Sequence, residues 1–499
     1  MRILEKSGNE ILLLALPNEE VSRGDYVLIE DGIQDMKMVV QVYDESYLDW
    51  PELVNDMVRD EILNTSAKRI EHDPLEIKTI AYLIRDMKLL RCKIRGVVER
   101  DSLISNLSWL PSRVTSKVKK LSIAELFSLA KRDGTRMIPM GIANSGEGFH
   151  ICAESLDGKL NIITGKKGTG KSHLAKLIVS RLAEYGAYTI IFDLNDEYGG
   201  IGWSKDGTPN SIHDKVLCLV PGHSLRFALD YIGLSGMVNM LQHTLDIPGA
   251  SLREFIRIWE LLRTQGSISM SSLGDTIQKW RCNELIKDAL FSRYHTMLSS
   301  NLFSDDCESS TKFEELSSRL KEGGVIIISL SRLQPLVRKM SVEVVLSKIV
   351  ELLGRGKIPP IFLFAEEAHL YLRDTYWDDL VTRMRHFGVF TTFITNQPDV
   401  IKDCIYRQAD NIFIFNFTND ADLESLSRAS ATDSDTIKSI AKTLPPRVCM
   451  VLGKAVNDLP IIVAVRPADM LTLGETNLFF KDEEDGMKVK VCGSISTKV

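Results

Sequence analysis

The chain has 499 residues, of which 44% are hydrophobic and 26% are charged, and its formal net charge is −6. This length allows roughly two to four domains, and the composition is typical of a soluble globular protein. The negative charge excludes a globally basic nucleic-acid-binding surface, so any such contact needs a local patch, for example a channel lining. Neither a signal peptide nor an apolar run of about 18 residues is present, so we expect neither secretion nor a membrane span.

The cysteines and histidines do not show the spacing typical of a metal site. Eight cysteines are scattered without a C-x-x-C pair, and the nine histidines show no metal-ligand spacing. These patterns indicate reduced thiols in a cytoplasmic protein, rather than a disulfide framework or a cysteine-based metal site.

Residues 1–135 are predicted to form a separate N-terminal domain. Short strand patterns, separated by turn residues such as Asp31-Gly32, lie at 10–16, 25–30, 36–42 and 89–98. Their spacing favours a small antiparallel β-barrel. Helical periodicity at 48–66 is expected to interrupt the barrel, and 117–132 to form a helix leading out of it.

Residues 136–465 are predicted to form an ATPase domain with a P-loop near its start. The stretch from Gly165 to Ser172 reads G-x-x-x-x-G-K-S, between an apolar run and a helical pattern. Glycines let the backbone wrap a phosphate chain, and the N–H groups at the helix start attract its charge. The alternative is a glycine-rich turn that matches by accident.

In this site Lys171 is expected to reach the β- and γ-phosphates of ATP, and the Ser172 hydroxyl to hold Mg²⁺. The predicted nucleotide-binding residues are Gly165, Lys166, Lys167, Gly168, Thr169, Gly170, Lys171, Ser172 and His173.

The remaining patterns predict a parallel sheet with an inserted helical subdomain. Strands are expected at 160–164, 188–193, 215–220, 325–330, 361–365, 389–395 and 411–417, with helices at 172–184 and 341–353. Alternation of strands and helices favours a parallel sheet covered on both faces. Segment 224–322 breaks this alternation, with helical patterns at 251–264, 273–298 and 312–321. A β pair at 448–452 and 461–465 ends the domain, and 466–499 are expected to form a tail with an acidic run.

A second half-site is predicted where the apolar segment 359–365 runs into Glu366-Glu367. A buried strand delivers both carboxylates to the carboxyl edge of the sheet, where ligands bind in such folds. Glu366 is expected to order Mg²⁺ and its water, and Glu367 to orient and deprotonate the attacking water. The alternative is a strand end solvated by two acids.

Five motifs resemble those of the HerA branch of the HerA/FtsK ATPases, and they occur along the chain in the order found in that family. Residues 366–369 resemble the E-E-A-H signature, and 385–388 (R-H-F-G) the G-R-K-F-G motif without its first glycine. Residues 396–398 (N-Q-P) resemble a polar strand end that usually reads Q-R-P. The turn 193–198 is similar to D-x-x-G-E-Y, with Asp196 in place of glycine, and 444–453 to the closing L-P-x-G…G segment.

The resemblance spans 137–465, and the N-terminal strands fit the small β-barrel of the family. It implies an α/β fold with a RecA-like P-loop ATPase core and a parallel-rich central sheet, beside the N-terminal barrel and the helical insertion at 224–322. It further implies a homo-oligomeric, hexameric ring that hydrolyses ATP with Mg²⁺ to move double-stranded DNA through its pore.

The partner is left open by the resemblance. Archaeal members act with the nuclease NurA in DNA end processing and repair, and some bacterial members act with other effectors in defence. The main hypothesis is therefore a ring-forming DNA translocase or helicase with a nuclease partner. The alternative is an ATP-gated ring scaffold that activates an effector enzyme. A nucleotide kinase is a distant third, because the E-E-A-H segment and the barrel have no role in one.

Further site residues follow from the family analogy. Gln397 is expected to sense the γ-phosphate, although a glutamine after a strand is often a turn residue. Lys159, ahead of the P-loop strand, and Arg385 are expected to act as cations in the site of a neighbouring subunit. Other donors considered are Arg355, Arg383 and Arg407. Asn416 occupies a position where many members have an arginine.

Several residues keep two interpretations. Asp193 and Glu197 either help to order water near Mg²⁺ or contact a neighbour, and His369 is expected to be structural rather than catalytic. The loop 199–207, with Trp203 and Lys205, and the loop containing Arg373 are candidate DNA contacts, with an ordinary surface loop as the alternative. Backbone contacts of this kind would carry no sequence specificity.

Overall fold

The computed structural model describes residues 1–32, 36–48, 86–99, 102–104, 109–130, 134–306, 309–320, 322–371, 385–401, 403–429 and 432–473. The predicted helix at 48–66, Arg373, Arg383 and the tail beyond residue 473 lie outside these ranges. The chain divides into two compact units. The barrel unit comprises Met1–Gly134, Pro139–Ile151 and Ile414–Arg466; the ATPase unit comprises Thr135–Ile138, Cys152–Phe413 and the chain from Pro467 onward.

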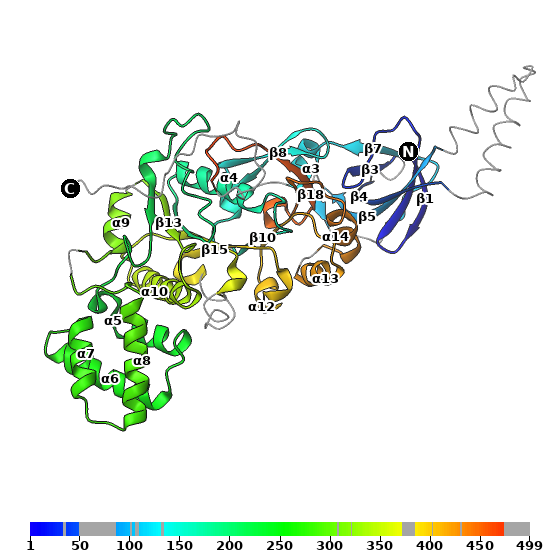
Figure 1. Ribbon diagram of the computed structural model, residues 1–499. Helices are drawn as coiled ribbons and strands as arrows, with labels where there is room; N and C mark the ends of the chain where they lie inside the picture. The colour runs from blue at the N-terminus through cyan, green and yellow to red at the C-terminus, as the bar shows by residue number, and fades with distance from the viewer. Residues whose placement is uncertain are drawn as a thin grey trace, which may run out of the picture. The chain divides into compact units, whose positions relative to one another are not determined.

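The barrel unit contains an antiparallel sheet in the order β1-β2-β5-β4-β3-β7, with β6 paired to β5 (Figure 1). Its strands are β1 Arg2–Ser7, β2 Glu10–Ala15, β3 Tyr26–Asp31, β4 Met36–Tyr47, β5 Lys88–Glu99, β6 Ser102–Ile104 and β7 Ser116–Leu121. Side chains alternate between two faces, as a pleated strand requires. On β2, Ile11 and Leu13 enter the main apolar core, whereas Leu12 and Leu14 join a smaller cluster with Leu89.

The predicted helix at 117–132 is wrong in its first half. Residues 116–121 form β7, which pairs with β3, and the helix α3 spans only Ile123–Ala130. Val118 and Leu121 are three residues apart, a spacing that also fits a helical face. Pairing with β3 decides the outcome, and Lys120 then reaches Asp25, with 2.7 Å between Nζ and Oδ2.

The rest of the barrel unit is a smaller group of strands and two helices. The strands run in the order β17-β18-β8-β9, with bounds β8 Met137–Ala143, β9 Gly148–Cys152, β17 Val448–Gly453 and β18 Ile461–Val465. Helix α13 spans Asp420–Ala429 and helix α14 spans Ser434–Ala441. Segment 414–465 thus shares a compact unit with the N-terminal strands, whereas the sequence analysis grouped it with the ATPase. The predicted domain boundaries stay a prediction.

A cluster around Arg95 joins helix α14 to the sheet. The Arg95 guanidinium donates to Asp433 Oδ2 (2.9 Å), Thr436 Oγ1 (3.0 Å) and Gln41 Oε1 (3.0 Å). Asp433 is the N-cap of α14 and accepts from the Thr436 N–H, so one carboxylate caps the helix and binds the sheet. Gln41 is fully buried and donates to the carbonyl of Pro460.

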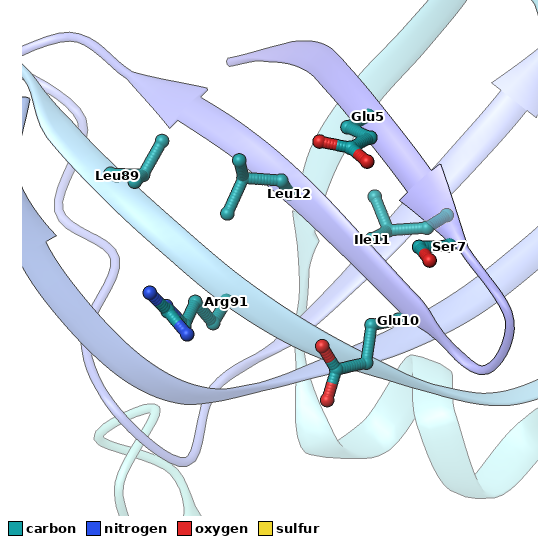
Figure 2. Close-up of a pocket in the computed structure, with 7 residues that line it drawn as sticks. All are labelled: Glu5, Ser7, Glu10, Ile11, Leu12, Leu89 and Arg91. Carbon is teal, nitrogen blue, oxygen red and sulfur yellow. The ribbon is translucent and has the colours of Figure 1, made fainter. Parts of the chain in front are cut away.

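The outer part of the sheet has an open cavity of about 270 Å³ on β1, β2 and β5 (Figure 2). Its lining combines apolar and charged side chains: Glu5, Ser7, Glu10, Ile11, Leu12, Leu89 and Arg91. None of the predicted nucleotide-site residues lines it. The lining carries two carboxylates and one guanidinium, and this excess of negative charge does not suit a phosphate chain, so we assign no nucleotide to this cavity.

The ATPase unit is built on a largely parallel sheet in the order β12-β13-β11-β14-β15-β10-β16. The strands are β10 Asn161–Thr164, β11 Tyr188–Asp193, β12 Val216–Leu219, β13 Gly324–Ser329, β14 Ile361–Glu366, β15 Val389–Thr395 and β16 Asn411–Ile414. Every ladder between neighbours from β12 to β10 is parallel. Most of these strands are buried along their whole length, as expected for strands covered on both faces. The predicted parallel-rich core is confirmed.

The helices of this unit include the predicted helical insertion. They are α4 Lys171–Glu184, α5 Leu229–His243, α6 Gly249–Thr264, α7 Met270–Lys279, α8 Glu284–Ser299, α9 Phe313–Arg319, α10 Pro335–Gly354 and the short α12 Asp403–Tyr406. The pattern at 273–298 corresponds to two helices, because the Ser269 and Asn283 side chains cap α7 and α8 separately. Helix α5 was not predicted. No helix in the described ranges is long and apolar enough to span a membrane.

Replacing Arg95 tests the link between α14 and the sheet. Arg95→Ala is expected to destabilise the barrel unit by about 2 kcal/mol, because Gln41 loses its buried donor and Asp433 loses a cation. Thermal unfolding of the full chain measures this, with Arg113→Ala, at an exposed arginine of the same unit, as control. Equal melting temperatures for both variants would contradict the assignment.

Candidate active site

The P-loop connects the end of β10 to the start of α4. Lys166, Lys167 and Gly168 are exposed, whereas Thr169 and Lys171 are buried. Gly168 and Gly170 have φ values of 78° and 118°, in the left-handed region that favours glycine. Helix α4 has Gly170 as its N-cap and no side-chain cap, so its first N–H groups remain available to an anion.

Lys171 is held inside the loop that it is predicted to serve. Its Nζ donates to the carbonyls of Gly165 (2.8 Å) and Lys166 (3.0 Å), and Thr169 Oγ1 also donates to Lys166 O (2.7 Å). Burial lowers the Lys171 pKa, while the nearby carboxylates of Glu367 and Glu366 raise it. The loop therefore keeps a preformed shape around a lysine that can exchange carbonyl oxygens for phosphate oxygens.

Ser172 and Glu366 meet across the sheet edge. The Ser172 hydroxyl donates to Glu366 Oε1 at 2.6 Å, although 194 residues separate them. Strand order explains the encounter, because β15 alone lies between β10 and β14, and all three strands end at the same edge. Glu366 is 1% exposed, and its Oε2 has no hydrogen-bond partner among the residues that the structure describes.

Burial dominates the electrostatics of the two glutamates. It raises the Glu366 pKa to about 8, with further increases from Glu197 and Asp193 and a decrease from the Ser172 hydrogen bond. Burial also raises the Glu367 pKa, and the charge of Lys171 opposes that shift. A buried carboxylate without a full set of partners is disfavoured as an anion, and a nearby cation reverses that preference. Oxygen donors of this kind suit Mg²⁺.

The residues at hand fit a magnesium ion bound with ATP. The orphaned Glu366 Oε2 and the adjacent Ser172 hydroxyl form an oxygen donor pair beside the helix N-terminus. In the described part of the chain, no group of three or more His, Cys, Asp or Glu residues makes a self-contained metal site. Such a pair suits an ion that takes its other ligands from phosphate and water.

A buried charge cluster flanks Glu366, and sequence reasoning recovered it only in part. Asp193, at the end of β11, accepts backbone N–H bonds from Asn195, Glu197 and Tyr198, yet burial raises its pKa to about 6. Lys176, from the second turn of α4, lies 3.7 Å from Glu197 Oε2 with only 4% of its side chain exposed. No motif marks Lys176; its position one turn beyond Ser172 is the signal that was available.

Asp196 replaces the glycine of the family turn, and its contacts account for the exchange. Its φ is 54°, in the left-handed region that a glycine enters freely. Its two carboxylate oxygens accept hydrogen bonds from the hydroxyls of Ser329 and Ser331 at the end of β13. Asp tolerates this conformation better than most residues, and the two serines bind its charge.

Gln397 follows β15 at the same sheet edge. Its backbone N–H donates to Thr395 Oγ1 at 3.0 Å, and its side chain is exposed. The Asn396 N–H donates to Glu367, and the buried Asn396 Oδ1 has no hydrogen-bond partner in the described part of the chain. This segment therefore touches Glu367 through its backbone, while the sensor role of the Gln397 side chain stays a prediction.

Lys159 and Arg385 lie at the opposite edge of the sheet. Lys159 precedes β10 and lies 3.7 Å from Asp410 Oδ1, with 37% of its side chain exposed. Arg385 precedes β15 and is exposed. Because the strands are parallel, residues before them lie at the amino edge, away from the P-loop of the same chain. Arg355, another candidate, precedes β14 and pairs with Glu351 at 3.0 Å.

The other residues weighed from the sequence have structural partners. Trp203 is half-buried, with its ring 4.3 Å from that of His213, so it is less exposed than expected. Lys205 is exposed, and its backbone N–H donates to Asp469 O. Asn416 donates to the carbonyls of Lys442 and Leu444, where it stabilises a turn.

The sequence of this chain is similar to that of known proteins. A family model described as the central domain of helicase HerA matches residues 159–349. The DNA double-strand break repair helicase HerA of Saccharolobus solfataricus is 23% identical over 504 residues, covering 92% of this chain and 90% of the relative. The protein of the same name from Sulfolobus acidocaldarius is 23% identical over 483 residues, covering 90% of each chain.

Among solved structures, the bacterial conjugative coupling protein TrwBdeltaN70 has a TM-score of 0.50 at 14% identity, over 70% of this chain and 92% of that chain. At this identity the likeness concerns the fold, which is that of a RecA-like P-loop protein. The matched family model and both archaeal relatives show that this ATPase is similar in sequence to HerA helicases.

Proposed function

We propose that this chain is an ATP-driven motor that moves double-stranded DNA through a homo-oligomeric, hexameric ring. The observation that carries the proposal is the meeting of Ser172 with Glu366 beside Lys171 and Glu367, in a chain similar to HerA over at least 90% of its length. The first part supports hydrolysis of ATP, and the second supports DNA as the cargo. We further propose a nuclease of the NurA type as the partner in DNA end processing.

In the proposed hydrolysis, Lys171 leaves the carbonyls of Gly165 and Lys166 and binds the β- and γ-phosphates. Ser172 and Glu366 would hold a magnesium ion, which would supply positive charge beside the phosphates. Glu367 accepts a proton from the attacking water, and its raised pKa makes it a stronger base than an exposed carboxylate. The Asn396 N–H holds this carboxylate in place.

The proposed ring gives the cations at the amino edge of the sheet a role. Lys159 and Arg385 precede β10 and β15, far along the strands from their own P-loop. In a head-to-tail ring, the amino edge of one subunit faces the nucleotide of the next. A cation from the neighbour then stabilises charge on the transferred phosphoryl group.

Two substitutions separate ATP binding from hydrolysis. Lys171→Ala is expected to abolish turnover by weakening binding, whereas Glu367→Gln should still bind ATP but hydrolyse it at least ~100-fold more slowly. A fluorescent ATP analogue measures binding and phosphate release measures turnover. Glu322→Gln, at an exposed glutamate, is the control. Wild-type turnover in Lys171→Ala would contradict the assignment of the site.

Mixing two inactive proteins tests the subunit boundary. Lys159→Ala and Glu367→Gln should each be inactive, and mixed rings should partly regain turnover, because some interfaces pair an intact Lys159 with an intact Glu367. Lys357→Ala, an exposed lysine ahead of β14, should stay active alone. If subunits exchange and no activity returns, Lys159 has no role in the neighbour, and the same mixture with Arg385→Ala becomes the test.

DNA dependence separates a motor from a scaffold. Turnover should rise strongly on long duplexes, and affinity for DNA should fall steeply with salt but not depend on base sequence, because phosphate contacts release counterions. Phosphate release and fluorescence anisotropy over a salt series measure both. Turnover that responds to an effector protein but not to duplex length would favour the ATP-gated scaffold.

A further inference from the structure

His369 lies between Glu367 and the end of β15. Strand β14 ends at Glu366, Glu367 has a left-handed φ of 47°, and the chain then enters a 3-10 turn at Ala368–Leu370. A non-glycine residue with this φ is held there by its surroundings. The tight turn brings the His369 ring back against the glutamate, with only 9% of its side chain exposed.

The Glu367 carboxylate is held at one side and open at the other. The N–H of Asn396, the residue after β15, donates to it, while Glu367 Oε2 is buried and has no hydrogen-bond partner within the described ranges. His369 Nδ1 lies 3.4 Å from that oxygen, longer than a good hydrogen bond. Contacts of catalytic groups are often long in a free enzyme and shorten in the reactive complex.

The same His369 nitrogen faces a second partner. Nδ1 lies 3.1 Å from Thr395 Oγ1, and that hydroxyl accepts the Gln397 N–H at 3.0 Å. The carbonyl of Thr395 accepts the hydroxyl of Thr164, the last residue of β10 before the P-loop (3.1 Å). A continuous set of polar contacts therefore runs from the start of the P-loop through Thr395 and His369 to Glu367.

In the tautomer that carries a proton on Nδ1, this one proton cannot bond fully to two acceptors. A bond to Thr395 leaves Glu367 Oε2 without a donor, whereas a bond to Glu367 fixes the plane of the carboxylate. Thr395 lies at the junction of β10 and β15, next to where the γ-phosphate is expected. A bound phosphate that shifts the 395–397 segment thus changes which acceptor the imidazole serves.

We propose that His369 is a positioning residue that orients Glu367 for water activation, a role that rests on the proposed ATPase function. Through its contact with Thr395, His369 also couples the orientation of Glu367 to the strand end at Thr395–Gln397. It touches neither ATP nor water and acts only through the glutamate. Sequence reasoning assigned His369 a structural role; the contact with a buried, unpartnered carboxylate oxygen assigns it a functional one.

The test compares two replacements of the ring in the full-length protein. His369→Leu fills similar space without a donor, whereas His369→Asn keeps an N–H near the Nδ1 position. His369→Leu should lower kcat roughly 10- to 100-fold with KM for ATP and analogue binding unchanged, because the base is misoriented but the P-loop is intact. His369→Asn should recover most of the loss. Equal kcat for both variants, or a loss in KM alone, would overturn the proposal.

Thr395 provides a second route, which is useful if His369→Leu does not fold. Thr395→Ser keeps the hydroxyl and should retain kcat, whereas Thr395→Val removes it and should lower kcat. The double variant Thr395→Val/His369→Leu should have the same kcat as the less active of the two single variants, since both substitutions act through one contact. Additive losses would show two independent effects and contradict the coupling.

These measurements use ATP turnover without DNA, so they do not depend on the motor. Absence of duplex stimulation in the wild type would reject DNA translocation while leaving the ratio of variant to wild-type kcat interpretable. Absence of any wild-type turnover would reject the proposed ATPase function itself. An unchanged kcat in an active His369→Leu protein rejects only the role of His369.

Discussion

The burial of the Glu366 carboxylate is the constraint on which the nucleotide site depends. A carboxylate that is 1% exposed needs partners, and within the described ranges it accepts one hydrogen bond, from Ser172. The remaining oxygen and the surrounding acids favour a divalent cation at this position. The parallel strands β10, β15 and β14 hold this arrangement, because their common polarity brings residues 194 positions apart to a single edge.

The local parts of the site could be predicted from sequence, and the parts made by long-range packing could not. The P-loop is one continuous stretch of sequence and so are the paired glutamates, so each can be recognised from the spacing of its own residues. Lys176 and Thr395 are ordinary residues in the sequence, and they acquire a role only because α4 packs beside β11 and β15 lies between β10 and β14. His369 was visible in the E-E-A-H segment, but its function depends on the φ of Glu367, which sequence does not reveal.

The fold shows the same division. Buried parallel strands such as β11 and β13 are continuous apolar runs, so their positions were predicted closely. Strand β7 was assigned to a helix, because its two apolar residues are three apart and four of its six residues are polar. Its identity comes from pairing with β3, a contact about 90 residues away in sequence. The missed helix α5 contains a non-helical Gly233, which interrupts its periodicity.

The turn at Asp196 has a consequence for which substitutions this part of the chain tolerates. A glycine there enters the left-handed region at little cost and needs no partner. An aspartate is strained in that region and carries a charge, and the hydroxyls of Ser329 and Ser331 donate hydrogen bonds to it. The three side chains therefore form an interdependent set, although Asp196 and the serines lie on different strand ends. Without these two hydroxyls the Asp196 carboxylate would stand beside the buried Asp193 with neither donor. A substitution on one side of the contact therefore changes which residues the other side tolerates.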